Sequence, residues 1–285
     1  MSSLSIAMLG AFAGLTIFLG LPFGRIKSDA VPLKAALNAI ATGILIFLLW
    51  DVLSQAWEPV DTALHAHHVG TALINGLVMA ACLGLGLLSL TSMDRYMRRR
   101  ATAAAVTSGV SGGAVAATTP TGSIALAAPP VAAPAVGAHR LALTIAIGIG
   151  LHNFAEGLAI GTAAAQGELA FAVLLVIGFG LHNATEGFGI VAPLTGTRPS
   201  WGYLALLGLI GGGPTFVGTI IGQSFRNDLV SIAFLGLAAG SILYVVIELL
   251  AVARRTGMKT LVAWFILAGI VAGFLTDAIV TAAGA

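Results

Sequence analysis

The stretch GIGLHNFAEGLAI at residues 148–160 and the stretch GFGLHNATEGFGI at residues 178–190 share one pattern. Each copy carries a histidine, an asparagine and a glutamate, which are His152, Asn153 and Glu156 in the first copy and His182, Asn183 and Glu186 in the second. On a helix, a histidine and a glutamate four residues later lie on one face, about 6 Å apart along the axis. Imidazole and carboxylate groups are metal-ligand types, so the duplicated pattern indicates a metal site.

The composition of the chain around these motifs is that of an integral membrane protein. Hydrophobic residues make up 58% of the sequence and charged residues only 8%, whereas a soluble domain carries about 25% charged residues. The single cysteine, Cys82, cannot form an internal disulfide. Near the N-terminus the first charges follow the first apolar run, an order that favours a transmembrane helix over a cleaved signal peptide.

Eight apolar runs have the length of about 20 residues that a bilayer requires. We predict an all-α membrane protein that forms a single transmembrane domain over residues 1–285, with spans near residues 4–24, 33–56, 70–91, 140–165, 168–194, 201–223, 229–252 and 260–282. Only Gln166, Gly167 and Glu168 separate the fourth span from the fifth, so these two form an antiparallel hairpin. Both motifs lie about 13 to 15 residues from that turn, which places them at one depth near the bilayer centre.

The loops between the spans predict the orientation of the chain. Of the 13 Lys and Arg residues, all but Arg226 fall in loops on one side of the membrane, which the positive-inside rule makes the cytoplasmic side. We therefore expect a multi-pass protein of a bacterial-type inner membrane, with both termini outside and the loop 92–139 inside. Residues 101–138 contain no charged residue and are rich in Ala, Thr, Gly and Pro. This composition predicts a flexible cytoplasmic linker.

Five carboxylates fall inside the predicted spans: Asp51, Glu156, Glu186, Glu248 and Asp277. No Lys or Arg is expected near a span centre, so the partner of an ionised carboxylate there must be a proton or a bound cation. For Asp51, Glu248 and Asp277, a place on the transport pathway and a hydrogen bond to a neighbouring helix are alternative interpretations. The loop between spans 2 and 3 carries His65, His67 and His68, which either capture a cation outside the membrane or belong to an ordinary polar loop.

At the two motifs the chain resembles the Zrt-/Irt-like (ZIP) divalent-metal transporters, and it is most similar to their bacterial GufA-type branch. The resemblance rests on His152, Asn153, Glu156 and Gly157, and on the matching residues of the second copy, His182, Asn183, Glu186 and Gly187. Tyr244 and Glu248 resemble a Tyr-and-acid stretch in the seventh span of the family. The resemblance implies a 3+2+3 arrangement, in which spans 1–3 and 6–8 are inverted repeats around the central 4–5 hairpin. It also implies a homodimer in the lipid bilayer.

The chain departs from the family pattern at three places. Ala155 and Thr185 stand where the family carries a motif proline. Gly213, before Pro214, stands where many relatives carry a glutamate ligand on the sixth span, and the long loop lacks the histidines that many members have. The site is therefore expected to be smaller than in relatives, with one metal as an alternative to two.

The sequence thus predicts transport of a divalent transition metal into the cytoplasm, with the metal as substrate and no nucleic acid as partner. Imidazole nitrogen and carboxylate oxygen together suit zinc, iron(II), manganese or cadmium, and zinc is the first choice. One alternative is a proton-coupled transporter of another solute, with the carboxylates as a relay. The other is an intramembrane metalloenzyme, but an asparagine follows each histidine where a metalloprotease carries its general base, so no enzymatic activity is expected.

Overall fold

The computed structural model describes residues 2–26, 30–110, 134–167, 169–194, 197–224 and 227–282. Within these ranges the chain is helical and contains no strand. The helices follow in the order α1 (Ser3–Leu15), α2 (Ile17–Gly20), η1 (Leu21–Arg25), α3 (Val31–His65), α4 (Val69–Val110), α5 (Pro134–Ala165), α6 (Leu169–Val191), η2 (Ala192–Leu194), α7 (Trp201–Gly222), α8 (Asp228–Arg255) and α9 (Lys259–Ala282). The described residues provide 8 spans long and apolar enough to cross a membrane, and α1, α2 and η1 together form the first. The predicted all-α fold with eight transmembrane helices is confirmed.

Local sequence signals fix where several of these helices begin and end. Ser200 caps α7 by accepting a hydrogen bond from the backbone N–H of Tyr203, and Asn227 caps α8 through the N–H of Val230. Between α5 and α6, Gly167 has a φ of +88°, a left-handed conformation that glycine adopts without a steric penalty. This residue closes the tight turn of the predicted hairpin.

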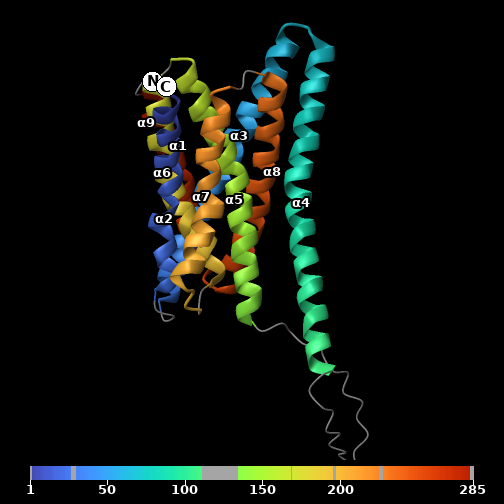
Figure 1. Cartoon of the computed structure of the whole chain (residues 1–285), viewed down its shortest axis with the longest axis vertical. Helices are drawn as coiled ribbons and strands as arrows, with labels where there is room; N and C mark the ends of the chain where they lie inside the picture. Colours follow the sequence, from blue (N-terminus) through green and yellow to red (C-terminus); the bar gives the residue numbers. More distant parts are fainter. Residues whose placement is uncertain are drawn as a thin grey trace, which may run out of the picture.

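The helices form a bundle in which α4 and α9 are the least buried spans (Figure 1). On one side α4 packs against α8, and on the other side α9 packs against α3. The inner helices α5 and α6 contact each other, and both contact α1. Helix α5 therefore lies within the bundle, whereas α6 keeps one exposed face along Val173, Ile177 and Leu181.

Close glycine contacts relate the first three spans to the last three. Gly43 on α3 and Gly269 on α9 lie so close that a Cβ on either would collide with the backbone of the other helix, and Gly240 on α8 meets Gly86 on α4 in the same way. Such small residues let membrane helices approach closely. The pairing makes α3 equivalent to α8, and α9 equivalent to α4. Because the first and sixth spans run in opposite directions, the repeat is inverted, as the 3+2+3 arrangement requires.

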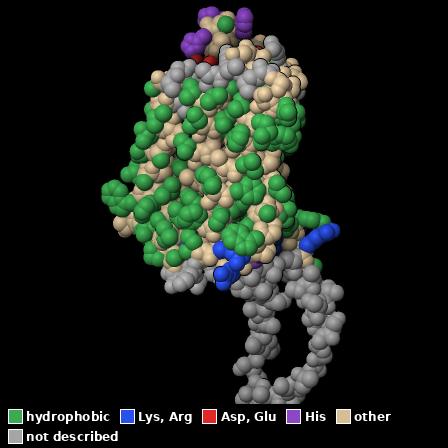
Figure 2. Space-filling model, turned by 60° about the vertical axis from the view of Figure 1, so that its left-hand side comes forward, with side chains coloured by type: hydrophobic (Ala, Val, Ile, Leu, Met, Phe, Trp, Pro, Cys, Tyr) green, Lys and Arg blue, Asp and Glu red, His purple; other side chains and the backbone are tan. Residues whose placement is uncertain are grey.

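Charge is distributed unevenly between the two ends of the bundle. Every Lys and Arg of the described residues lies at the end opposite the chain termini, which we call the basic end. Figure 2 shows Lys and Arg side chains at this end and histidines at the other. The latter we call the terminal end, because Figure 1 places both termini there. Arg226, predicted to be the exception, and Lys27 lie outside the described residues.

Three helices extend beyond the spans predicted for them. Helix α3 continues through Pro59 to His65, where a loop was expected, because Val60 and Ala63 are buried against Ala72 of α4. Helix α4 continues to Val110 and α5 begins at Pro134, so both ends of the expected linker 101–138 are helical. The alanines at residues 101–105 favour this extension, because alanine has the highest helix propensity. The rest of the expected linker, residues 111–133, lies outside the described residues.

Candidate metal centre

The two motifs face each other across the α5–α6 hairpin, at the same depth in the bundle. The six motif side chains come from two helices and are at most 9% exposed: His152, Asn153, Glu156, His182, Asn183 and Glu186. Helices α5 and α6 are both continuous through the motifs. Where the family carries a proline, Thr185 instead donates a hydrogen bond from its hydroxyl to the carbonyl of His182. The absence of the motif prolines therefore leaves two regular helices that present their ligand-type groups to one point.

Four of these side chains converge into what we call the His/Glu group, formed by His152, Glu156, His182 and Glu186. Oε1 of Glu156 lies 2.9 Å from Nε2 of His152 and 2.5 Å from Nε2 of His182. Oε1 of Glu186 lies 3.6 Å from Nε2 of His152. The ligand atoms of His152, Glu156 and His182 all lie within 4.8 Å of one another. Three potential ligand atoms from two helices are thus already gathered around a volume the size of one ion.

Several polar atoms of this group have no hydrogen-bond partner among the described residues. They are Oε2 of Glu156, both carboxylate oxygens of Glu186 and Nδ1 of His152. Buried polar atoms are normally satisfied, and an uncompensated buried carboxylate is costly. Because the described Lys and Arg residues all lie at the basic end, no Lys or Arg of this part of the chain balances the two glutamates. The donor set therefore fits a cation that accepts imidazole nitrogen and carboxylate oxygen.

Asn153 and Asn183 make equivalent contacts with helices outside the hairpin. The amide of Asn153 donates a hydrogen bond to the carbonyl of Gly211 on α7, at 3.0 Å. The amide of Asn183 donates to the carbonyl of Ala13 on α1, at 3.2 Å. Both Oδ1 atoms are buried without a hydrogen-bond partner among the described residues. The two asparagines therefore fix α7 and α1 against the hairpin, and each keeps a buried amide oxygen without a hydrogen-bond partner among the described residues.

The motif glycines serve the packing of neighbouring helices. A Cβ at Gly157 would collide with the carbonyl of Thr215 on α7, and a Cβ at Gly187 would collide with α2 at Ile17 and Gly20. These contacts bring α7 and α2 against the two ligand-bearing helices. Packing is therefore the role that the structure gives to Gly157 and Gly187.

Gly213 does not point toward the His/Glu group, although the resemblance places a ligand there. A Cβ at Gly213 would meet no atom within 4 Å. Its neighbours along the same helical face, Leu209, Phe216 and Val217, are 62%, 39% and 47% exposed. The position therefore lies on the outward face of α7, so a carboxylate at residue 213 would begin on the side away from the His/Glu group. The side of α7 toward the hairpin carries Gly211 and Thr215.

A cavity of about 460 Å³ reaches His182 from the terminal half of the bundle. We call it the aspartate cavity because Asp51 of α3 and Asp277 of α9 line it together with His182. Gln55, which also lines it, donates a hydrogen bond to the carboxylate of Asp51 at 2.9 Å. The structure thus brings two of the three candidate pathway residues to one cavity beside the His/Glu group.

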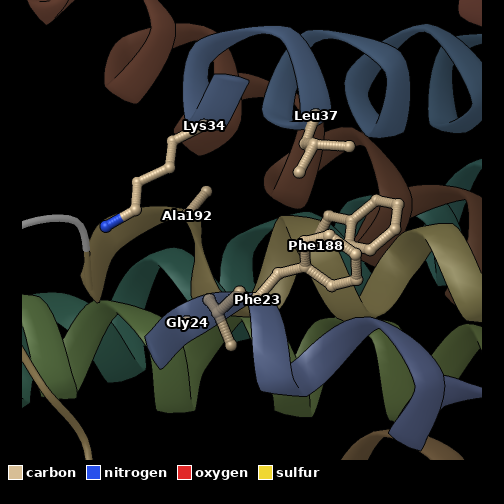
Figure 3. A pocket seen from close by; sticks show the side chains of 7 residues that line it. Phe23, Gly24, Lys34, Leu37, Phe188 and Ala192 are labelled. Carbon is tan, nitrogen blue, oxygen red and sulfur yellow. The ribbon is translucent and has the colours of Figure 1, made fainter. Parts of the chain in front are cut away.

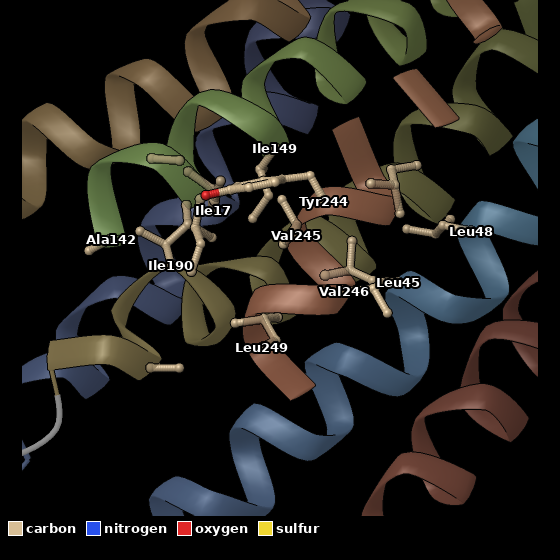
Figure 4. Close-up of a cluster of buried hydrophobic side chains, with 14 of the residues drawn as sticks. Ile17, Leu45, Leu48, Ala142, Ile149, Ile190, Tyr244, Val245, Val246 and Leu249 are labelled. Atoms are coloured by element: carbon tan, nitrogen blue, oxygen red, sulfur yellow. The ribbon is translucent and has the colours of Figure 1, made fainter. Parts of the chain in front are cut away.

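On the side of the basic end, apolar side chains close the bundle below the His/Glu group. Leu45, Ile149, Ile190, Val245 and Leu249 come from α3, α5, α6 and α8 and are at most 1% exposed. Figure 4 shows them gathered in one cluster, which we call the apolar plug. Water and ions cross such a dry contact poorly, because a desolvated charge has no partner there. The His/Glu group is therefore reached by a cavity on one side and sealed on the other.

The third candidate pathway residue, Glu248, belongs to a different cluster near the basic end. It interacts electrostatically with Asp94, Arg98 and Arg255 rather than with the His/Glu group. Asp94 is only 7% exposed, and its carboxylate accepts a hydrogen bond from Nε of Arg98 at 2.6 Å. Sequence reasoning missed Asp94, because it lies just beyond the predicted end of the third span. Its i, i+4 spacing to Arg98 is the signal that could have revealed the pair.

The candidate capture histidines lie at the terminal end, where α3 turns into α4. His65 is exposed, and its Nδ1 lies 3.4 Å from a carboxylate oxygen of Asp61. His67 has a φ of +58° and occupies the tight turn. The groups that could hold a metal, among the described residues, include none of His65, His67 and His68. The structure therefore leaves these histidines as an exposed cluster, separate from the buried centre.

Comparison with known proteins yields one family match. The family model described as ZIP Zinc transporter matches residues 118–281, which include both motifs and the last five spans. No curated protein matches the chain. The family is one of divalent-metal transporters, which accounts for a buried His/Glu group in a multi-pass membrane protein and supports a transporter rather than an enzyme. The matched region covers more than half of the sequence, and the chain therefore belongs to the ZIP zinc transporter family.

Proposed function

We propose that this chain carries zinc, or a metal of similar chemistry such as iron(II), manganese or cadmium, into the cytoplasm through the His/Glu group. The observation that carries this proposal is the convergence of His152, Glu156 and His182, whose ligand atoms lie within 4.8 Å of one another. Glu186 completes the group from the second helix. Two imidazole nitrogens and two carboxylates form a donor set that suits zinc, which prefers four ligands.

Charge balance supports one metal ion per site. Glu156 and Glu186 are the two carboxylates of the His/Glu group, and one divalent ion neutralises both. Asn153 and Asn183 are neutral, and each offers an amide oxygen without a hydrogen-bond partner among the described residues. A second divalent ion at the same place would leave about two uncompensated positive charges in a region of low dielectric. As neutral oxygen donors, the two asparagines would add no charge as auxiliary ligands of the same ion.

The two sides of the His/Glu group support alternating access. Asp51 and Asp277 line the cavity through which a cation would reach His182, and the apolar plug separates the same site from the basic end. The positive-inside rule assigns the basic end to the cytoplasm, so the aspartate cavity opens toward the outside of a bacterial-type inner membrane. Inward transport then requires the α5–α6 hairpin and its partners to move relative to α3 and α8, opening the plug.

Uptake by proteoliposomes across a panel of metals tests this function. The wild-type protein should accumulate zinc and cadmium in preference to magnesium and calcium, because the latter prefer all-oxygen sites. Glu156→Gln should abolish uptake. Asp228→Asn makes the same carboxylate-to-amide change at an exposed residue in the first turn of α8 and should retain it. Equal uptake of magnesium and zinc, or full activity in Glu156→Gln, would contradict the proposal.

The homodimer implied by the family resemblance stays a prediction. Helices α4 and α9 are the least buried spans, and their apolar side chains, such as Leu85 and Leu275, are 62% and 60% exposed. Both a second copy of the chain and lipid suit such a surface. Single-molecule photobleaching of labelled protein in bilayers measures the subunit number directly.

A further inference from the structure

The close glycine contacts of the bundle join its helices into two groups. In the first, which we call the hairpin group (α1, α2, η1, α5, α6 and α7), a Cβ at Gly157 of α5 or at Gly14 of α1 would collide with the backbone of α7. In the second, the flanking group (α3, α4, α8 and α9), Gly43 of α3 meets the backbone of α9 and Gly86 of α4 that of α8. Helices whose backbones touch cannot slide past each other without clashes, so each group is held as one body.

The boundary between the two groups is built from side chains instead. A Cβ at Gly148 of α5 would first meet the side chain of Val245 on α8, and a Cβ at Gly189 of α6 would first meet that of Leu249. Val245 and Leu249 both belong to the apolar plug. Side chains can change rotamer where backbone atoms cannot move, so this boundary is where one group can shift against the other.

A pocket of about 20 Å³ interrupts the same boundary near the basic end. Figure 3 shows Leu37 of α3 on one side of this pocket and the rings of Phe23 and Phe188 on the other. The two rings meet edge to face, with their centroids 4.7 Å apart, and both belong to the hairpin group. A gap between packed surfaces forfeits dispersion contacts, so apolar contact holds this part of the boundary weakly.

An ion pair crosses the boundary at the basic end. Nε of Arg140 on α5 lies 3.7 Å from Oδ1 of Asp94 on α4, and the two side chains are only 17% and 11% exposed. The other oxygen of Asp94 accepts a hydrogen bond from Arg98, which lies on α4 as well. Arg140 also lines a cavity of about 800 Å³ on the basic-end side of the apolar plug. The pair of Asp94 with Arg140 therefore joins the hairpin group to the flanking group beside the space into which the plug would open.

We propose that the ion pair between Asp94 and Arg140 is a latch, which holds the basic end closed while the aspartate cavity is open. Movement of the hairpin group that opens the plug separates Arg140 from Asp94. Asp94 keeps Arg98 as its partner when the latch opens, so no carboxylate is left buried without a countercharge. A single, partly exposed pair is weak enough to break in every transport cycle. The latch rests on the proposed function, because it presupposes a second conformation that is open toward the basic end.

Thiol labelling of the full-length protein, without metal, tests the latch. Two reporters are introduced separately in a Cys82→Ala background: Val245→Cys in the apolar plug and Thr276→Cys at the aspartate cavity. Arg140→Gln should raise the maleimide labelling rate of the plug reporter about 3- to 10-fold, because it shifts the population toward the conformation open at the basic end. It should not raise the rate of the cavity reporter. A rise at both reporters would mean a general loosening of the bundle and would overturn the proposal.

Matched variants separate the ion pair from surface charge. Arg95→Gln removes a charge from the exposed residue next to Asp94 and should leave both labelling rates unchanged. Asp94→Asn should act like Arg140→Gln, and the double variant should not exceed the larger single effect, because the two residues form one contact. An equal effect of Arg95→Gln, additive effects in the double variant, or an unchanged plug reporter in the single variants would overturn the latch.

The outcome is independent of folding problems in one variant and of the transport assay. If either Arg140→Gln or Asp94→Asn fails to fold, the other decides. Zinc uptake by the wild-type protein reports on the proposed function, whereas labelling is measured without metal. An absent latch and an absent transport activity therefore give different results.

Discussion

Oε1 of Glu156 on α5 lies 2.5 Å from Nε2 of His182 on α6, within hydrogen-bonding distance, and 2.9 Å from Nε2 of His152. One carboxylate oxygen thus connects the two halves of the duplicated motif. Zinc binds imidazole nitrogen and carboxylate oxygen at about 2.0 to 2.2 Å, so an ion at this place replaces the direct contact between the side chains. A metal that binds here therefore competes with the His–Glu hydrogen bond for the same atoms.

The central position of Glu156 predicts unequal effects of the two glutamates. Glu156→Gln should lower metal affinity more than Glu186→Gln, because Glu156 contacts both imidazoles whereas Glu186 lies 3.6 Å from one of them. Removing an outer-shell partner of a metal ligand lowers metal affinity roughly 10- to 100-fold. The loss of zinc affinity in Glu156→Gln should be larger than this. Isothermal titration calorimetry with zinc measures both variants. A larger loss in Glu186→Gln would mean that the ion lies nearer α6 than the structure indicates.

The aspartate cavity predicts an effect on rate rather than on affinity. Asp51→Asn and Asp277→Asn remove negative charge from the route to His182, so zinc uptake at low concentration should fall several-fold, most strongly at low ionic strength. Equilibrium zinc affinity should change little, because neither residue belongs to the His/Glu group. Initial uptake rates at two salt concentrations, with Asp228→Asn as control, test this. Uptake that is as fast as in the wild type at low salt would exclude the cavity as the route.

Two adjacent glycines of α7 predict opposite effects on stability. A Cβ at Gly212 would collide with the carbonyl of Gly14 on α1, so Gly212→Ala should destabilise the protein by about 1 to 3 kcal/mol through overpacking. A Cβ at Gly213 meets open space, so Gly213→Ala should be neutral or stabilising by up to about 1 kcal/mol through helix propensity. Thermal unfolding in detergent ranks the pair. The reverse order would show that α1 and α7 are not packed as described.

The same outward face predicts that a glutamate at Gly213 does not restore a metal ligand. Gly213→Glu should leave zinc affinity and stoichiometry unchanged, because its side chain begins on the exposed side of α7 among Leu209, Phe216 and Val217. The cost should appear instead as poorer insertion or stability, since a carboxylate then faces lipid. Zinc titration of the detergent-solubilised variant provides the measurement. A second bound zinc would show that α7 can rotate this position inward.

We predict that the segment 111–133 is dispensable for zinc uptake. It contains no charged residue, no histidine and three prolines, so it offers neither metal ligands nor the pattern of a packed helix. Replacing it by a shorter Gly-Ser linker should leave zinc uptake within about twofold of the wild-type rate, because loop-closure entropy changes slowly with length. Uptake per correctly inserted protein, measured in proteoliposomes, tests this. A correctly inserted but inactive deletion would assign the segment a regulatory role.

Much of the site could be predicted from the sequence, because bilayer thickness constrains helix length and therefore depth. The spacing of each motif from the turn at Gly167 places His152 and His182 at one level, and the structure brings both to Oε1 of Glu156. Because all Lys and Arg except Arg226 fall in loops on one side, their distribution supports the count of eight spans. These features follow from counting along the chain, so they need no knowledge of which helices are neighbours.

The amino-acid sequence by itself thus determined the eight spans, the hairpin and the pairing of its motifs. Only the tertiary structure decided which face each helix turns inward. In the folded bundle Asp51 and Asp277, which are 226 positions apart in the sequence, line one cavity. Glu248 lies in the cluster of Asp94, and Gly213 lies on the outward face of α7. The physical reason is that helices apolar on all sides carry little periodic signal. Their rotation is set by backbone contacts such as that between Gly14 and Gly212, which form only in the packed bundle.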